Sequence, residues 1–120
     1  MDSKRKVIGE MVSFRDSLKL HHWAITGPAS YARHIALDQA IDSLSDTIDR
    51  IVETTIATEG DLNIVIPETI NPSNIIEHCK TFYTKVDGAR SLFDEIFEQA
   101  IIDDFQEGIQ QLLYRLIRLQ

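Results

Sequence analysis

The sequence predicts an all-α fold: one four-helix bundle domain over residues 1–120, with a long irregular connection between its second and third helices. Apolar residues recur at spacings of three and four over most of the chain. No stretch alternates apolar and polar residues as a half-buried strand does. The helical stretches are joined by short connections except at one place, and a chain of 120 residues is too short for two independently stable domains.

The first two helices are predicted on either side of a Gly-Pro pair. The spacing of apolar residues predicts a helix over about residues 4–24, which Gly27-Pro28 ends. A second helix, over about residues 28–58, keeps its apolar residues on one face and has no glycine or proline beyond its first residue. At about 1.5 Å per residue this helix is about 45 Å long.

The third helix follows the irregular stretch, residues 59–71. The short apolar run NIVIP within that stretch is expected to pack over one end of the bundle. Asn71-Pro72 supplies an N-cap residue followed by proline at the first helical position. A third helix is therefore predicted from Pro72 to about Ala100.

The fourth helix is predicted from Asp103-Asp104, whose charges suit a helix N-terminus, to the last residue. Gly88 and Gly108 interrupt the third and fourth helices, and each is expected to mark a close approach of another element. The fourth helix has more apolar residues than one core-facing stripe requires, so some are expected at subunit contacts: Leu112, Leu113, Leu116, Ile117 and Leu119.

The amino-acid composition limits the kinds of molecule that the protein is expected to bind. The formal net charge of −7 argues against nonspecific nucleic-acid binding, since phosphate neutralisation supplies most of that affinity, so DNA binding is expected to be weak or absent. The single cysteine, Cys79, cannot form an intrachain disulfide and is most simply a small buried residue. No segment approaches the roughly 20 apolar residues of a membrane span, and the residues after Lys4-Arg5-Lys6 are too polar for a signal peptide. A cytoplasmic protein without membrane contact is expected.

An acidic stripe runs along the second predicted helix, apart from its apolar face. With Asp38 taken as zero and an advance of about 100° per residue, His34 falls at about −40°, Asp49 at about 20° and Glu53 at about 60°. Such a stripe alone is usually a solvated face. His34 and Asp38 are four residues apart, as are Asp49 and Glu53, so each pair can present two ligand atoms to one ion.

His22 adds a third ligand to the first pair, because the Gly-Pro break returns the chain to the level of His34. Asp49 and Glu53 lie at least 11 residues beyond Asp38, roughly 16 Å along a rigid helix, and cannot share that ion within one chain. An isologous dimer with antiparallel second helices brings the two halves together and creates two shared sites. Imidazole and carboxylate ligands suit iron, and zinc or manganese would also be accommodated.

The same residues carry a family resemblance. The spacings are those of the ferroxidase motif of Dps-type mini-ferritins, the iron-storing DNA-protection proteins of starved bacteria within the ferritin-like superfamily; the matching residues are His22, Trp23, Gly27, His34, Asp38, Asp49 and Glu53. The E-x-x-H signature of the di-iron centre inside one bundle is missing. The resemblance is concentrated between His22 and Glu53, and the chain would be a short member.

The resemblance implies a ferroxidase that stores iron and protects against oxidative stress. In the family, His22, His34 and Asp38 of one subunit would bind iron with Asp49 and Glu53 of its two-fold partner, and Trp23 would pack beside the metal. Fe(II) would be oxidised by hydrogen peroxide or oxygen, and Fe(III) would be stored as mineral inside a homo-oligomeric shell, a dodecamer in the family.

Four further acidic residues and His21 lie near the predicted ligands or at the start of the fourth helix. Asp42 and Asp46 continue the acidic stripe and would suit mineral nucleation, or are solvated surface carboxylates. Asp103 and Asp104 stand where the uptake pore of the family is often acidic, or simply complement the helix dipole. His21 is expected near the ligands or at the surface. The chain lacks the lysine-rich tail by which some members hold DNA.

Two further functions stay open. A helical oligomer that binds zinc or another divalent ion structurally, without turnover, would use the same ligands. A metal-free bundle that binds a partner through its acidic face would need none of them. No H-E-x-x-H, G-x-S-x-G or phosphate-loop motif indicates another class of enzyme.

Overall fold

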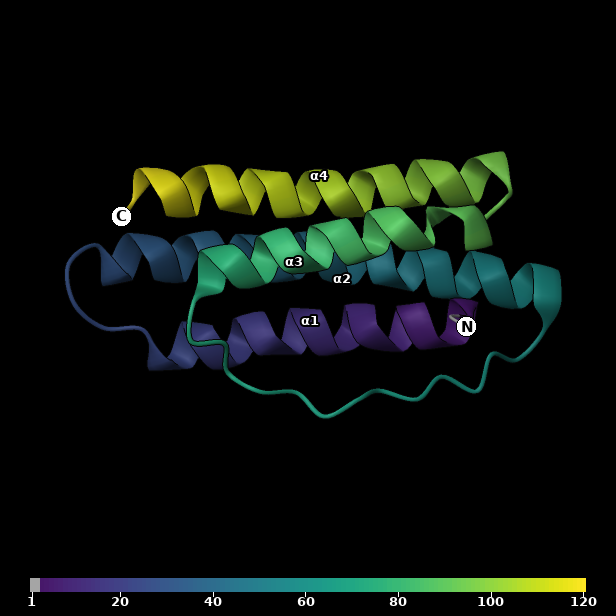
Figure 1. Cartoon of the computed structure of the whole chain (residues 1–120), viewed down its shortest axis with the longest axis horizontal. Helices are drawn as coiled ribbons and strands as arrows, with labels where there is room; N and C mark the ends of the chain where they lie inside the picture. Colours follow the sequence, from purple (N-terminus) through teal and green to yellow (C-terminus); the bar gives the residue numbers. More distant parts are fainter. Residues whose placement is uncertain (1–2) are drawn as a thin grey trace.

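The computed structural model describes residues 3–120, which form four α-helices and one short 3-10 turn (Figure 1). No strand occurs within this range, so the predicted all-α fold with four helices is confirmed. None of the described helices is long and apolar enough to cross a membrane. The elements are α1 (Lys4–Ala24), α2 (Ser30–Glu59), α3 (Ile75–Ala89), η1 (Arg90–Leu92) and α4 (Ile96–Arg118).

Neighbouring helices of the bundle all run antiparallel. α1 and α2 form one hairpin, and α3 and α4 form the other (Figure 1). α2 packs against α1 and α4, and α3 packs against α4 and α1, so the parallel pair α2 and α3 lies on a diagonal. Because α2 and α3 run in the same direction, the chain between them must return along a molecule that is 46 Å long. This requirement explains the single long connection.

The first hairpin has the predicted boundaries within two residues. α1 begins after Ser3, whose hydroxyl accepts a hydrogen bond from the backbone N–H of Lys6. The turn that follows contains two residues with left-handed backbone, Gly27 (φ 90°) and Ala29 (φ 62°). α2 ends at Glu59, and the next residue, Gly60, has a positive φ of 85° and an N–H that donates to the carbonyl of Ile56.

The predicted boundaries of the third and fourth helices are wrong. α3 begins at Ile75, because the Asn74 side chain rather than Asn71 accepts from a backbone N–H of the first turn. α4 begins at Ile96, where the side chains of Glu95 and Glu98 form a reciprocal capping box. Asp103 and Asp104 therefore lie inside α4 and do not complement its N-terminal dipole.

The connection between α2 and α3, residues 60–74, is a strap that runs along α1 (Figure 1). The expectation that its apolar run covers a bundle end is wrong. A Cβ atom on Gly9 would overlap the carbonyl oxygen of Val65, and the hydroxyls of Ser13 and Thr69 share a hydrogen bond of 2.8 Å. Within the described chain, residues 61–73 make no backbone–backbone hydrogen bond, so side chains and this close approach hold the strap.

The interior of the bundle is a single apolar cluster contributed by all four helices. Gly108 lets α4 approach α2, since a Cβ there would lie 3.1 Å from Leu44 Cδ2, as expected. Gly88 has nothing within 4 Å of that position, so the expectation of a close approach there is wrong. On α4, Leu112, Leu113 and Leu116 belong to the core, whereas Ile117 is exposed.

Replacement of Gly9 by alanine is expected to destabilise the fold by about 1–3 kcal/mol, because the new methyl group forces the strap away from α1. The measurement is the free energy of unfolding from urea titration. Gly88→Ala is the matched control: it adds the same methyl group to a helix without a neighbour, and should stabilise by up to about 1 kcal/mol. Equal stability of Gly9→Ala and the unaltered protein would contradict a tightly seated strap.

Candidate metal centre

The α1–α2 hairpin brings three of the predicted ligands into contact. His22, in the last turn of α1, and His34, in the second turn of α2, have ring centroids 3.7 Å apart. His22 Nε2 lies 3.1 Å from Asp38 Oδ2, one turn further along α2. These contacts follow from the short turn between the two helices and the four-residue spacing of His34 and Asp38.

His22 is buried, and its imidazole is incompletely satisfied. Its exposed fraction is 6%, and neither ring nitrogen makes a well-aligned hydrogen bond with any described residue. The contact with Asp38 has the distance of an ion pair but lacks hydrogen-bond geometry. A buried nitrogen without a hydrogen bond lowers the stability of the fold by about 1–3 kcal/mol. Coordination of a cation by the His22 ring would offset part of this loss.

Lys19 is a neighbour of this cluster that the sequence reasoning missed. Its Nζ donates to Asp38 Oδ1 at 3.2 Å and lies 5.8 Å from the centroid of the Trp23 ring. The hydrogen bond from Lys19 lowers the pKa of Asp38, and His22 lowers it further, so Asp38 is a carboxylate at neutral pH. Trp23 is exposed, which excludes a role in the core. The signal available was the three-residue spacing of Lys19 and His22 on one face of α1.

Asp49 and Glu53 do not join these residues within the chain. Both are exposed on α2, at least 11 residues beyond Asp38, or about 16 Å along the helix. Within residues 3–120 no three His, Cys, Asp or Glu side chains form a group that could hold a metal ion. One chain thus presents an imidazole–carboxylate cluster at one end of α2 and a separate carboxylate pair toward the other end.

The two remaining histidines lie where α1, the strap and α3 meet, His21 on α1 and His78 on α3. His21 is half-buried, and its burial, together with the nearby Arg33, lowers its pKa. Burial and His21 lower the pKa of His78, whose Nε2 is 2.7 Å from Ser17 Oγ. Both side chains serve the seam between helices and strap rather than the candidate centre.

Cys79 is buried as expected, and burial raises the pKa of its thiol to about 12. The neutral thiol is a poor nucleophile and a poor metal ligand at physiological pH. Cysteine chemistry therefore has no part in the candidate centre.

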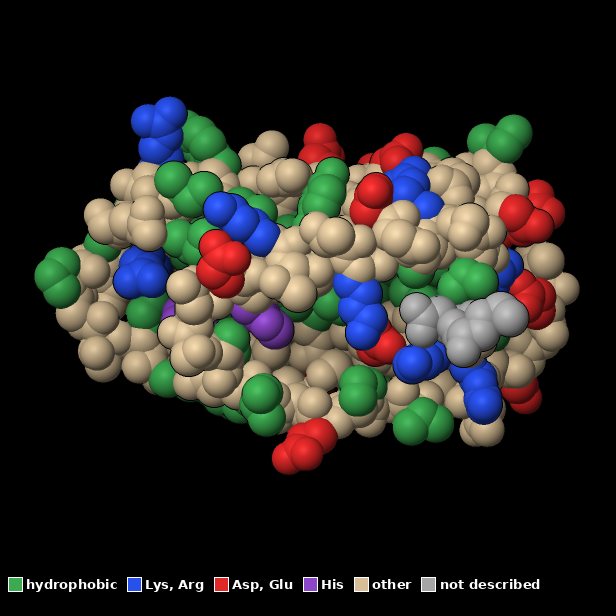
Figure 2. Space-filling model, viewed as in Figure 1, with side chains coloured by type: hydrophobic (Ala, Val, Ile, Leu, Met, Phe, Trp, Pro, Cys, Tyr) green, Lys and Arg blue, Asp and Glu red, His purple; other side chains and the backbone are tan. Residues whose placement is uncertain are grey.

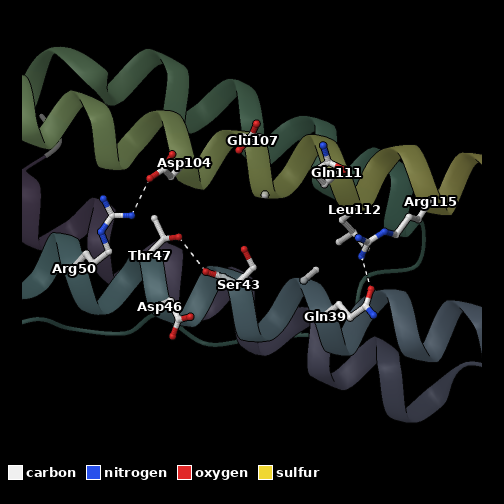
Figure 3. Close-up of a pocket in the computed structure, with 12 residues that line it drawn as sticks. Gln39, Ser43, Asp46, Thr47, Arg50, Asp104, Glu107, Gln111, Leu112 and Arg115 are labelled. Atoms are coloured by element: carbon white, nitrogen blue, oxygen red, sulfur yellow. Dashed lines mark hydrogen bonds and ion pairs between the residues drawn. The ribbon is translucent and has the colours of Figure 1, made fainter.

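A polar groove of about 590 Å³ between α2 and α4 was not predicted (Figure 3). Asp46 of the acidic stripe lines it. At one end Arg50 Nη1 lies 2.8 Å from Asp104 Oδ2, and at the other Arg115 Nη1 donates to Gln39 Oε1 at 2.8 Å (Figure 3). Asp103, outside the groove, is paired with Arg90. Arginine pairing therefore already neutralises both aspartates that were expected to start α4.

Residues 22–116 match a family described as a family of unknown function (DUF5856). The chain belongs to this family. The DUF5856 match begins at His22 and covers all five candidate ligands, together with α2, the strap, α3 and most of α4. No curated protein and no solved structure matches the chain.

Proposed function

We propose that this protein is a ferroxidase and iron-storage protein whose site is completed by a second copy of the chain. The observation that carries the proposal is the contact of His22 with both His34 and Asp38, together with the unsatisfied, buried ring of His22. Imidazoles and a carboxylate form a suitable half-site for Fe(II). Asp49 and Glu53, exposed on the same helix, supply the other half from the partner.

The exposed apolar residues of α2 support the same arrangement of two chains. An antiparallel pairing that places His34 of one copy opposite Glu53 of the other, and Asp38 opposite Asp49, also places Tyr31 opposite Ile56. Tyr31 is 78% exposed and Ile56 38% exposed, although both are large apolar residues. On the helical wheel both lie within about 20° of Asp38. The register chosen for the ligands thus covers apolar surface at both ends of the interface.

The chemistry needs two iron ions and one peroxide. Two Fe(II) ions each lose one electron to hydrogen peroxide, its O–O bond breaks, and two protons complete two molecules of water. Delivery of both electrons at one place avoids release of a hydroxyl radical. The shared carboxylates would hold the Fe(III) products until they pass to mineral stored in the oligomeric shell, in a protein that protects its cell from iron and peroxide.

Oxidation of Fe(II) tests the proposal directly. With hydrogen peroxide present, the protein is expected to oxidise Fe(II) faster than buffer does, as followed by the absorbance of Fe(III). The double variant His34→Ala, Asp38→Ala should lose more than about 10-fold in rate, since the half-site loses two ligands. Asp42→Asn with Asp46→Asn is the matched control, because it removes two charges from the same helix but no proposed ligand.

The other outcomes identify the alternatives. Tight binding of Fe(II) or Zn(II) without accelerated oxidation would replace the ferroxidase with a structural metal site at the same interface. Absence of binding, measured by calorimetry, would leave the metal-free partner-binding bundle.

A further inference from the structure

The first turn of α4 carries an exposed apolar pair, Ile96 and Phe97, which we term the α4 knob. Ile96 is 88% exposed and Phe97 is also exposed. The capping box fixes the start of α4 at this point and leaves both side chains outside the core. A hydrophobic side chain projects from the surface at the beginning of α4 (Figure 2).

An apolar groove of about 380 Å³ lies between α3 and the second half of α4. It is larger than the cavities of about 150 Å³ that accept a benzene-sized group. Lys80 is its only charged lining residue, although the chain as a whole carries a formal charge of −7. The lining residues of this α3–α4 groove are Lys80, Tyr83, Thr84, Gln110, Leu113, Tyr114 and Ile117.

The knob cannot fill the groove of its own chain. Ile96 precedes Leu113, in the groove, by 17 residues of the same helix, and this separation amounts to about 25 Å at 1.5 Å per residue. α4 is continuous between them. Any contact between the two surfaces must therefore join different molecules.

The charges around the two surfaces are complementary. Asp94, two residues before the knob, is exposed and makes no ion pair with the described residues. Lys80, at the groove, is likewise exposed and makes no ion pair within residues 3–120. The guanidinium of Arg118 lies 5.4 Å from the centroid of the Tyr114 ring and adds a second positive charge at the groove. The acidic, apolar knob and the basic, apolar groove are therefore complementary in charge and alike in apolar character.

We propose that the α4 knob of one copy docks into the α3–α4 groove of another, with Asp94 facing Lys80. The two surfaces are different, so the contact is heterologous and repeats from chain to chain until a ring closes. It lies on the α3–α4 hairpin and uses none of the candidate metal ligands. Combined with the two-fold pairing through α2, it supplies the second interface that a closed shell needs.

Ile96→Asp tests the apolar part of the contact, with sedimentation in metal-free buffer as the measurement. The unaltered protein should form assemblies larger than a dimer, and the variant should lose them. An acidic residue in the first turn suits the helix dipole, so the variant should keep its fold, which circular dichroism checks. Ile70→Asp is the matched control, because Ile70 is 68% exposed on the strap and outside both surfaces; it should leave the assemblies intact.

Exchange of charges tests the pairing itself. Asp94→Lys and Lys80→Glu should each weaken the assembly, and the double variant should restore it. A dimer or monomer for the unaltered protein at about 100 μM, or no effect of either single exchange, would overturn the proposed docking. Assembly is measured without metal, so it is independent of the iron chemistry. If the assemblies form but the protein does not oxidise Fe(II), only the proposed function is rejected. If the protein oxidises Fe(II) but forms no assemblies, only the docking is rejected.

Discussion

A dimer assembled from two inactive variants is expected to recover one of its two Fe(II) sites. One variant carries alanine at His22, His34 and Asp38; the other carries Asp49→Asn and Glu53→Gln. Each variant alone should bind no Fe(II) tightly, since every site lacks half of its ligands. In the mixed dimer, the intact histidine half of one chain meets the intact carboxylate pair of the other, and the second site combines both damaged halves.

The measurement is anaerobic titration of Fe(II) into mixed dimers isolated through two different affinity tags. A tagged pair in which both chains carry Asp42→Asn and Asp46→Asn is the control for tagging and refolding, and should keep both sites. If the mixed dimer binds no iron while this control does, the ligands do not converge between chains and the shared site is wrong. The separation of about 16 Å between the two half-sites is what makes the outcome decisive.

Lys4→Met is expected to destabilise the bundle by about 3 kcal/mol, because it leaves a buried carboxylate without its cation. Lys4 Nζ lies 2.9 Å from Glu98 Oε2, and Glu98 is only 1% exposed. Burial alone would lower the pKa of Lys4, but hydrogen bonds to Glu59 and Glu98 outweigh it and raise the pKa, so Lys4 is charged at neutral pH. The hydroxyl of Thr55, 3.4 Å from Glu98, compensates only part of the loss.

Urea titration of three variants measures this effect. Lys4→Met with Glu98→Gln should regain much of the stability, since no unpaired charge stays buried. Arg50→Met is the matched control: it breaks an ion pair in which both side chains are half exposed, and should cost no more than about 1 kcal/mol. Equal losses for Lys4→Met and Arg50→Met would show that the Glu98 carboxylate is hydrated rather than buried.

The first hairpin could be predicted from the sequence because the Gly-Pro pair between its helices is compatible with a turn and not with a continuous helix. Gly27 has a positive φ, which glycine adopts without strain, and Pro28 cannot continue α1, so the turn is fixed locally. Asn71-Pro72 has the same local form as a helix start but a different outcome. Asn71 lies close enough to His21, 50 positions earlier in the chain, to raise the pKa of that imidazole, and Asn74 caps α3 instead. Local spacing carries no information on such a partner.

The candidate site also has a part that local sequence predicts and a part that it does not. The contacts among His22, His34 and Asp38 follow from one turn and one helical repeat, and both were legible in the sequence. The polar groove beside Asp46 is lined by residues of both α2 and α4, so the sequence of neither helix alone predicts it. Asp104 looked like a helix cap but pairs with Arg50 of α2. Tertiary pairing overrides local charge preference there.

The strap divides the chain into two helical hairpins, and within residues 3–120 no backbone hydrogen bond joins one hairpin to the other. Residues 61–73 form none in the described chain, so a protease that cut there would sever one covalent link and leave the apolar interior in place. The fragment before the cut would keep every candidate iron ligand, and the fragment after it would keep both the knob and the groove. Expressed as separate peptides, the halves would form a split protein in which iron chemistry and assembly can be altered independently.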